Sequence, residues 1–206
     1  MKQISFEDKD KWLEGRRGRV TGTRLKDLIV KRGTARKKGF YEIIAERVAI
    51  PRDEHENRID RGITLESEAL ARFVEVTGKQ ANGELVLWER EDNPDIAISP
   101  DGYVVPGPDG KITEAIEIKC LNPASHLEAY LTREIPSEYE YQAKQYFCVN
   151  DDLQTLYFCF YDPSMPVDFF YLTMNRADIA EEVEQLVQLQ KDTLAEIERI
   201  SNELTF

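Results

Sequence analysis

Hydrophobic residues recur with a helical period in the first third of the chain and near its end. Between 63 and 77 the apolar positions fall every three to four residues, at Leu65, Ala69, Phe73 and Val76. This spacing places them on one stripe of a helix, and Gly78 is a typical residue just beyond a helix end. Helices are also predicted over 6–16, 21–32 (capped by Thr21 or Thr23), 39–49, 136–150 and about 178–203.

The middle of the chain alternates with a period of two, which is typical of strands. Strands are predicted over 84–90, 95–99 and 115–120, joined as a hairpin meander by turn-forming sequence such as "VPGPDGK" at 105–111. Two further strands follow at 155–162 and 168–174. This order of elements predicts an α/β fold with a central mixed β-sheet flanked by α-helices. A length of 206 residues with 41% hydrophobic residues suits a single domain over 1–206.

The formal charge of −12 argues at first against a polyanionic partner. Residues 1–50, however, hold 14 Lys and Arg against 7 Asp and Glu, so the acidic excess lies in the rest of the chain. A solvated basic face would explain this segregation, and so would a channel that admits a polyanion and repels it elsewhere. The charge pattern alone does not choose between these two interpretations.

The expected cellular location and the expected redox state of the cysteines follow from sequence features that the chain lacks. It contains no run of about 20 apolar residues, and its N-terminus has no signal-like apolar stretch, so we expect a cytoplasmic protein without a membrane partner. Cys120, Cys148 and Cys159 have no CxxC spacing and are predicted to be reduced thiols in the core. Two histidines are too few for a histidine zinc site.

The stretch "SPDG…EIKC" contains the candidate chemistry. Alternation puts Glu117 and Lys119 on one face of a strand, and taken alone this predicts a half-buried strand with a solvated face. Asp101, taken alone, is a turn residue. Adjacent antiparallel strands joined through 104–113 would nevertheless bring Asp101 near Glu117. Two carboxylates and a backbone carbonyl are ligands that Mg²⁺ prefers, and a nearby lysine could position a metal-bound water for phosphodiester cleavage.

This P-D…E-x-K arrangement resembles the PD-(D/E)xK, or restriction-endonuclease-like, nuclease superfamily. Six ordered blocks are similar to its lambda-exonuclease or YqaJ-type viral recombinase family: "WLEGRRGRVTGT" at 12–23, "RGITLESEA" at 61–69, "SPDG" at 99–102, "EIKC" at 117–120, "YEYQ" at 139–142 and "YDPSM" at 161–165. The resemblance spans most of the chain and implies a restriction-endonuclease-like core.

Family roles are carried over where residues match. The resemblance implies that Asp101, Glu117 and the Ile118 carbonyl bind a first Mg²⁺ and that Lys119 is the catalytic lysine. Glu66, which by itself would be an exposed helix charge, would bind a second Mg²⁺ or orient water. Two ions are expected, with Mn²⁺ as an acceptable substitute. Gln142 would hold the lysine or the water, whereas Lys144 stands where the family often has a second glutamine.

The resemblance also implies a DNA-binding set. Arg16, with Arg17 as the alternative, would donate twice to a 5′-terminal phosphate, as a planar guanidinium can. The hydroxyls of Thr23 and Ser99 would join it. Ile59 falls where the family has an apolar wedge that parts the end of the duplex.

The activity implied is 5′-to-3′ digestion of one strand of linear duplex DNA from 5′-phosphorylated ends, leaving a 3′ overhang. Family members imply a homotrimeric ring, a single-strand annealing protein as partner, and a phage or prophage gene expressed in a bacterial host.

Other functions stay open. Another PD-(D/E)xK endonuclease or DNA-repair nuclease would use the same residues. A non-catalytic DNA-end-binding module is disfavoured because the carboxylates and the lysine are all present. "GPDGK" at 107–111 is too short for a phosphate-binding P-loop and is predicted to be a turn.

Overall fold

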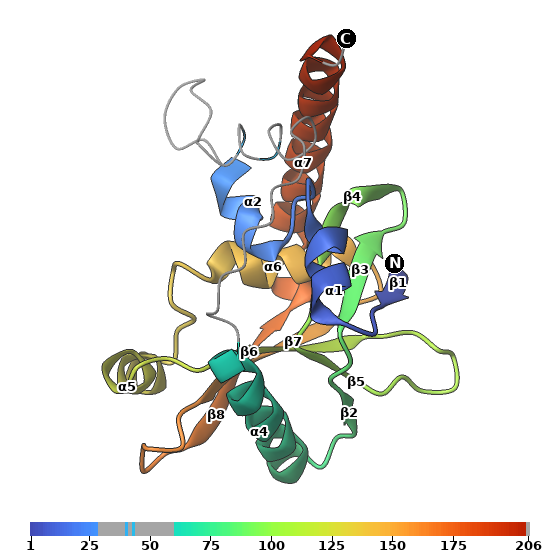
Figure 1. The fold of residues 1–206 in the computed structure, drawn as a ribbon. Coiled ribbons are helices and arrows are strands. Elements are labelled where there is room, and N and C mark those ends of the chain that lie inside the picture. The colour runs from blue at the N-terminus through green and yellow to red at the C-terminus, as the bar shows by residue number, and fades with distance from the viewer. Residues whose placement is uncertain (29–39, 41–42, 44–59, 205–206) are drawn as a thin grey trace.

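The computed structural model describes residues 1–28, 40, 43 and 60–204. Its centre is a five-stranded sheet in the order β2-β5-β6-β7-β8 (Figure 1). The strands are β2 (Ala81–Asn82), β5 (Gly102–Val104), β6 (Glu114–Lys119), β7 (Thr155–Tyr161) and β8 (Phe169–Asn175). β6 and β7 run parallel and the other neighbours antiparallel, which confirms the predicted mixed sheet.

A second, antiparallel sheet has the order β1-β3-β4, from β1 (Lys2–Ser5), β3 (Val86–Arg90) and β4 (Asn93–Ile98). The predicted three-strand meander was therefore wrong in its third member, because β6 lies in the other sheet. The turn after β4 starts a short strand that the sequence did not predict, β5, and this strand rather than β4 pairs with β6.

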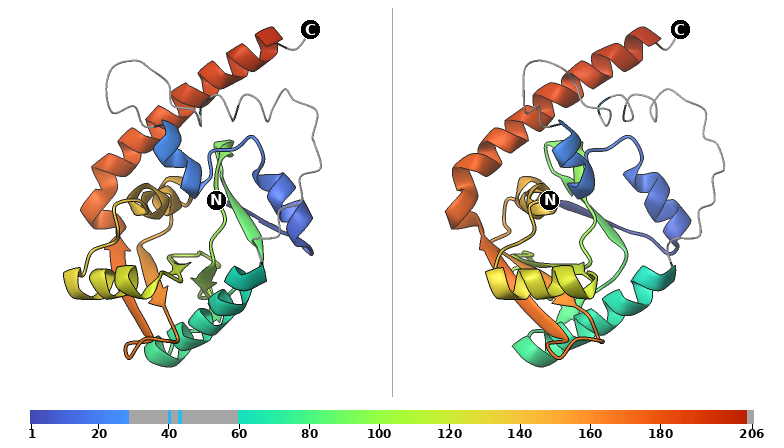
Figure 2. Two further views of the ribbon diagram at one scale, coloured as in Figure 1. Left: turned by 60° about the vertical axis from the view of Figure 1, so that its left-hand side comes forward. Right: turned by 90° about the vertical axis from the view of Figure 1, so that its left-hand side faces the viewer.

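Helices cover both faces of the five-stranded sheet (Figures 1 and 2). On one face α4 (Asp60–Thr77) packs Ala69 and Phe73 against Ile116 and Ile118. On the other face α6 (Glu140–Val149) and the long α7 (Arg176–Leu204) enclose the larger core. Leu65, Ala69 and Phe73 of the apolar stripe predicted for 63–77 lie on the packed side of α4, as its 3.6-residue period requires, whereas Val76 near the end of the helix is exposed.

Two N-terminal helices lie beside β3 and α6. α1 (Lys9–Arg16) begins after Asp8, whose carboxylate accepts a hydrogen bond from Lys11 N at 2.9 Å. α2 (Gly22–Leu28) begins directly after Thr21, one of the two predicted caps, and packs on α6. Most of the helix predicted over 39–49 lies outside the described residues.

One helix was not predicted. α5 (Pro123–Thr132) is capped by Asn122, whose side chain accepts from Ser125 N at 3.0 Å, and starts with a proline in its first turn. Only His126 and Ala129 of this helix are buried, so its apolar pattern is too weak to reveal it.

Burial corrects one prediction about the cysteines. Cys148 and Cys159 are buried, and burial raises the pKa of the Cys148 thiol to about 12. Cys120, expected in the core, is exposed because it follows the last residue of β6. All three are free thiols, as predicted.

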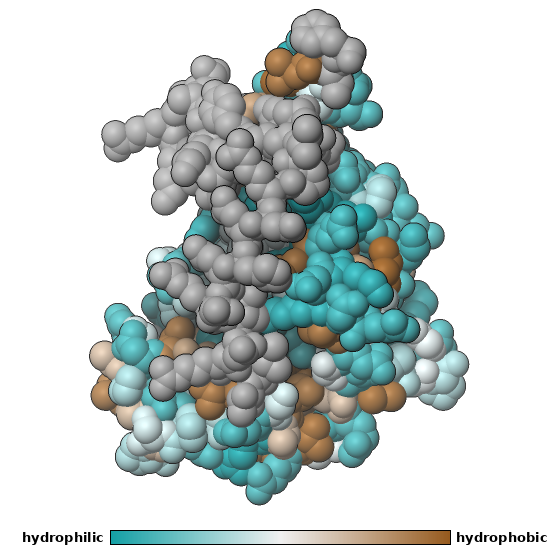
Figure 3. Space-filling model, viewed as in Figure 1, coloured by the Kyte–Doolittle hydropathy of each residue, from teal (hydrophilic) through white to brown (hydrophobic). Residues whose placement is uncertain are grey.

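The described residues on the face drawn in Figure 3 are mostly hydrophilic, with hydrophobic residues in small spots. Among the described residues, no helix is both long and apolar enough to cross a bilayer.

Candidate active site

The pairing of β5 with β6 brings the two predicted metal-binding carboxylates together. Gly102 lies opposite Ile116, so Asp101 just before β5 reaches the carboxyl-terminal half of β6. Its Oδ2 accepts a hydrogen bond from Ile118 N at 2.7 Å. The "SPDG" turn thus also anchors a side chain across the strand pair.

Glu117 is buried, with only 1% of its surface exposed, and both carboxylate oxygens are hydrogen-bonded. Oε1 accepts from Gln142 Nε2 at 2.6 Å and from the Lys119 ammonium group. Oε2 accepts from the Tyr146 hydroxyl at 2.5 Å. The solvated strand face that Glu117 and Lys119 indicate when taken alone does not occur at Glu117: α6 covers this side chain, and a buried charge is tolerated there because it is paired and hydrogen-bonded.

Lys119 remains a cation at this site. Burial lowers its pKa, but the charges of Glu117 and Asp101 and the hydrogen bond to Glu117 outweigh burial, so the net pKa is raised. Its ammonium group also lies 5.0 Å from the centre of the Tyr139 ring. The protonated form of Lys119 is suited to holding an anionic or polar group in place.

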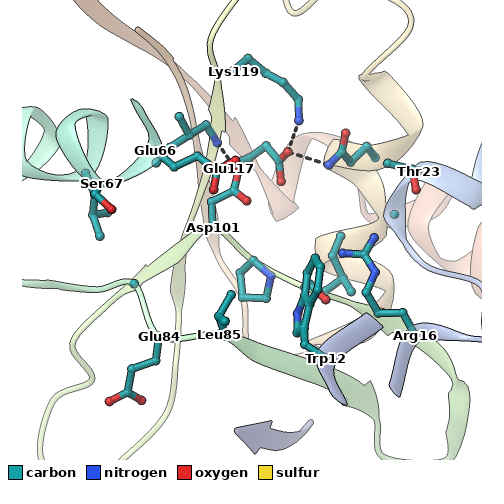
Figure 4. Close-up of a pocket in the computed structure, with 18 of the residues that line it drawn as sticks. Trp12, Arg16, Thr23, Glu66, Ser67, Glu84, Leu85, Asp101, Glu117 and Lys119 are labelled. Carbon is teal, nitrogen blue, oxygen red and sulfur yellow. Dashed lines mark hydrogen bonds and ion pairs between the residues drawn. The ribbon is translucent and has the colours of Figure 1, made fainter. Parts of the chain in front are cut away.

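Acidic groups gather around Glu117. Burial, and then repulsion from Glu117, raise the pKa of Asp101 well above its usual value. The same two causes, in the same order, raise the pKa of Glu66, which α4 brings to this place. Figure 4 shows Glu66, Asp101 and Glu117 converging, with Lys119 beside Glu117.

This cluster fits a hard divalent cation by its chemistry. Its donors are carboxylate oxygens close to the Ile118 backbone, and the raised pKa values of Asp101 and Glu66 report negative charge that a cation would neutralise. Within the described ranges, no three His, Cys, Asp or Glu side chains already stand in a metal-binding arrangement. A set based on Asp101 and Glu117 would need a backbone carbonyl and water to complete it.

The opposite wall of the site is cationic and aromatic. The Arg16 guanidinium stacks 4.3 Å from the centre of the Trp12 ring, one turn earlier on α1 (Figure 4). Trp12 is held by a hydrogen bond from Nε1 to Val86 O at 3.3 Å. Burial lowers the Arg16 pKa, and Glu117 and Asp101 raise it; a guanidinium stays charged at any working pH.

Nine of the eleven predicted site residues line one cavity of about 500 Å³: Arg16, Thr23, Glu66, Ser99, Asp101, Glu117, Ile118, Lys119 and Gln142. Ser99 Oγ is buried and has no hydrogen-bond partner among the described residues. Arg17 is not a lining residue, and Ile59 lies outside the described residues. The structure thus brings together residues from α1, α2, α4, β6 and α6 and from the connection between β4 and β5.

The residues that the sequence did not indicate include Trp12, which lines the cavity, and Tyr146, which contacts Glu117 from behind it. Each stands four positions from a predicted site residue on the same helix, and that spacing could have revealed them. Lys144, two positions after Gln142, points away from the site: its ammonium group pairs with Glu140 at 2.5 Å and Glu182 at 2.7 Å. It links α6 to α7 and does not take up the role of a second glutamine.

Comparisons with known proteins agree with this geometry. The chain is similar to the crystal structure of an alkaline exonuclease, LHK-Exo, from Laribacter hongkongensis, with a TM-score of 0.76 and 28% identity over 95% of this chain and 98% of that one. The structure of LHK-Exo in complex with dAMP matches with the same TM-score and coverage, at 27% identity. No curated protein sequence matches. The model of the YqaJ-like viral recombinase domain matches residues 11–152, and the chain therefore belongs to this family.

Proposed function

We propose that this chain is a metal-dependent nuclease of the PD-(D/E)xK type that digests linear duplex DNA from its 5′ ends. The observation that carries the proposal is one cavity in which Asp101, Glu117, Lys119 and Gln142 face a stacked arginine, Arg16. A cation site beside a fixed guanidinium is what hydrolysis next to a terminal phosphate requires. The similar LHK-Exo is an alkaline exonuclease, which supports the reaction class.

The metal would be Mg²⁺, with Mn²⁺ as a substitute. Asp101, Glu117 and the Ile118 carbonyl would hold one ion, and Glu66 would contribute to a second. Bound there, a divalent cation polarises a phosphate and lowers the pKa of water. Lys119, whose ammonium group is hydrogen-bonded to Glu117, would orient the reacting groups. Gln142 also donates a hydrogen bond to Glu117, and so helps to fix the carboxylate with which Lys119 pairs.

Recognition of the DNA end would use the opposite wall. Arg16 can donate two parallel hydrogen bonds to a terminal phosphate, and Trp12 limits its orientations. Ser99, with its unpartnered buried hydroxyl, and Thr23 would add neutral donors. Holding a 5′ phosphate here would set the 5′-to-3′ direction and leave a 3′ overhang. The LHK-Exo complex contains dAMP, a deoxynucleoside monophosphate of the size that such digestion would release.

Assembly and partners extend the proposal. Membership of the YqaJ-like viral recombinase family supports a phage or prophage origin, a ring of three chains around duplex DNA, and a single-strand annealing protein that receives the overhang. Segregated charge supports a DNA channel, because residues 1–50 hold 14 basic against 7 acidic residues in a chain of net charge −12. A single nuclease domain over 1–206 would provide each subunit.

The decisive experiment compares a blunt, 5′-phosphorylated linear duplex with a covalently closed circle in Mg²⁺. An exonuclease degrades the linear DNA to mononucleotides and leaves the circle intact. A nicked or linearised circle would instead identify an endonuclease of the same superfamily. End binding without digestion of either substrate would identify a non-catalytic DNA-end-binding module.

A further inference from the structure

Tyr146 lies behind the proposed metal site and contacts its central carboxylate. The Tyr146 hydroxyl donates to Glu117 Oε2 at 2.5 Å, while Gln142 donates to Oε1 at 2.6 Å. Gln142 and Tyr146 are one turn apart on α6, so both side chains project from the same face of that helix onto β6. Glu117 is therefore held from two directions by two neighbouring turns of one helix.

Only one of these two donors reaches the cavity. Gln142 lines it, whereas Tyr146 does not and has none of its surface exposed. A bound cation and a DNA strand would therefore meet Gln142 but not Tyr146. Any influence of Tyr146 on the chemistry must pass through the groups that its hydroxyl contacts, which include the Glu117 carboxylate and the Asp101 backbone.

The Tyr146 ring is fixed by aromatic packing. Trp88, also fully buried, packs edge-on against it with ring centroids 6.3 Å apart and an interplanar angle of 86°. The Trp88 indole is itself anchored by a hydrogen bond from Nε1 to Gln3 Oε1 at 3.2 Å. Ile116 O, a second acceptor near the hydroxyl, is at 3.5 Å, so the shorter bond to Glu117 dominates.

We propose that Tyr146 is a positioning residue that holds the Glu117 carboxylate in its cation-binding orientation. Groups that bind a metal ligand from outside typically change metal affinity or activity by 10- to 100-fold when removed. Tyr146 occupies such a place because its hydroxyl directs one oxygen of Glu117 and leaves the other side of the carboxylate to the cavity. The inference rests on the proposed function, since it assumes that Glu117 binds a divalent cation.

The test is the variant Tyr146→Phe, which removes one hydroxyl and keeps the ring against Trp88. Isothermal titration of Mn²⁺ and Mg²⁺ alone, without DNA, is expected to show about tenfold weaker binding. Digestion of linear duplex should then need a correspondingly higher metal concentration for half-maximal rate, while KM for DNA stays unchanged. Tyr141→Phe is the matched control on the same helix, because Tyr141 contacts Lys144 and not Glu117.

The outcomes separate this inference from the proposed function. Cation affinity in Tyr146→Phe equal to that of the unmodified chain overturns the positioning role, whatever the rate of digestion. A chain that digests no DNA but whose cation affinity falls with Tyr146→Phe keeps the positioning role and refutes the nuclease. Absence of any cation binding by the unmodified chain refutes both.

A second comparison of variants tests the inference even if Tyr146→Phe folds poorly. If the hydroxyl acts on the Glu117 charge, Tyr146→Phe should lower Tm by less in a Glu117→Gln background than in the unmodified chain. Equal losses of Tm in the two backgrounds would show that the hydroxyl does not act through Glu117 and would overturn the inference.

Discussion

Ile118 donates its backbone N–H to Asp101 Oδ2 at 2.7 Å, across the junction of β5 and β6. This bond ties a turn carboxylate to the strand that carries Glu117 and Lys119. It also keeps the Asp101 carboxyl close to Glu117 in a buried place, where burial and the charge of Glu117 raise the pKa of Asp101. Without a bound metal ion this arrangement costs stability, and the first prediction depends on this cost.

Asp101→Asn should stabilise the metal-free protein at neutral pH and abolish digestion. The Asp101 pKa is raised by burial and by Glu117, so the folded state binds the proton more tightly than the unfolded state, whose pKa is near 3.8. Stability is therefore present at low pH and is lost as pH rises through the raised value. Thermal unfolding in EDTA should show Tm of Asp101→Asn equal to that of the unmodified chain below pH 3.8 and higher at pH 8.

Asp162→Asn is the control with the opposite sign. Its pKa is lowered, first by the Ser164 hydroxyl, which donates at 2.6 Å, and then by Ser164 N. Its contribution to stability is present above the ordinary pKa of 3.8 and disappears as pH falls through the lowered value. Asp162→Asn should lower Tm at pH 8. If both Asp101→Asn and Asp162→Asn raised Tm at pH 8, repulsion within the site would not be the cause of the gain.

Lys119→Ala should reduce kcat by about 10²- to 10³-fold, the usual effect of removing one fixed charge or donor at a reacting group. Binding of duplex ends should persist, because Arg16 lies on the other wall and is unchanged. The measurement is digestion of linear duplex beside end binding in Ca²⁺. Lys79→Ala is the control: it removes a lysine that pairs with Glu114 at the other end of β6, at 2.7 Å, and should leave kcat unchanged.

Arg16→Ala should erase the preference for a 5′-phosphorylated end. The guanidinium is the group that can donate twice to one phosphate, and Trp12 holds it toward the cavity. Rates on phosphorylated and unphosphorylated ends of the same duplex give the ratio to compare. Arg17→Ala, which changes a residue outside the cavity lining, should keep the preference. Rates that fall by the same factor on both ends after Arg16→Ala would contradict recognition by this residue.

Gly22→Ala should disturb the site through packing. A Cβ at this position would lie 2.6 Å from Ile98 Cδ1 and 3.1 Å from Gln142 Cγ, so the start of α2 could not stay as close to α6. We expect a loss of about 1–3 kcal/mol in unfolding free energy and slower digestion as Gln142 moves from Glu117. Gly107→Ala, whose Cβ would meet Asp109 Oδ1 only at 3.9 Å, is the control, and equal losses in both would refute the packing argument.

Much of the site could be anticipated from local pattern. The stripe of Leu65, Ala69 and Phe73 predicted α4, and with it the helix that presents Glu66. The turn at "SPDG" followed by an alternating strand predicted the approach of Asp101 to Glu117, and β5 and β6 pair accordingly. The roles of these residues stay predictions.

Local pattern failed where a partner distant in sequence decides the outcome. Alternation correctly placed Ile116 and Ile118 on the opposite face of the strand from Glu117. It did not show that the Glu117 face would also be covered, as it is by α6. The third strand of the predicted meander belongs to the other sheet. The helix α5 has few buried residues, so its sequence shows no clear helical period of apolar positions. The spacing of Tyr146 from Gln142 put both residues on one face of the helix, but it did not show that the Tyr146 hydroxyl reaches Glu117, because a tyrosine in an apolar helix is ordinary core.

Periodicity is a property of neighbouring residues, so the sequence by itself determined which side chains share a face of a helix or strand. The tertiary structure decided which faces meet, because packing and hydrogen bonding join α1, α4, β6 and α6 across more than a hundred positions of the chain. Glu117 illustrates the difference. Its face was readable from alternation, but its burial and its bonds to Gln142 and Tyr146 exist only once α6 lies against β6.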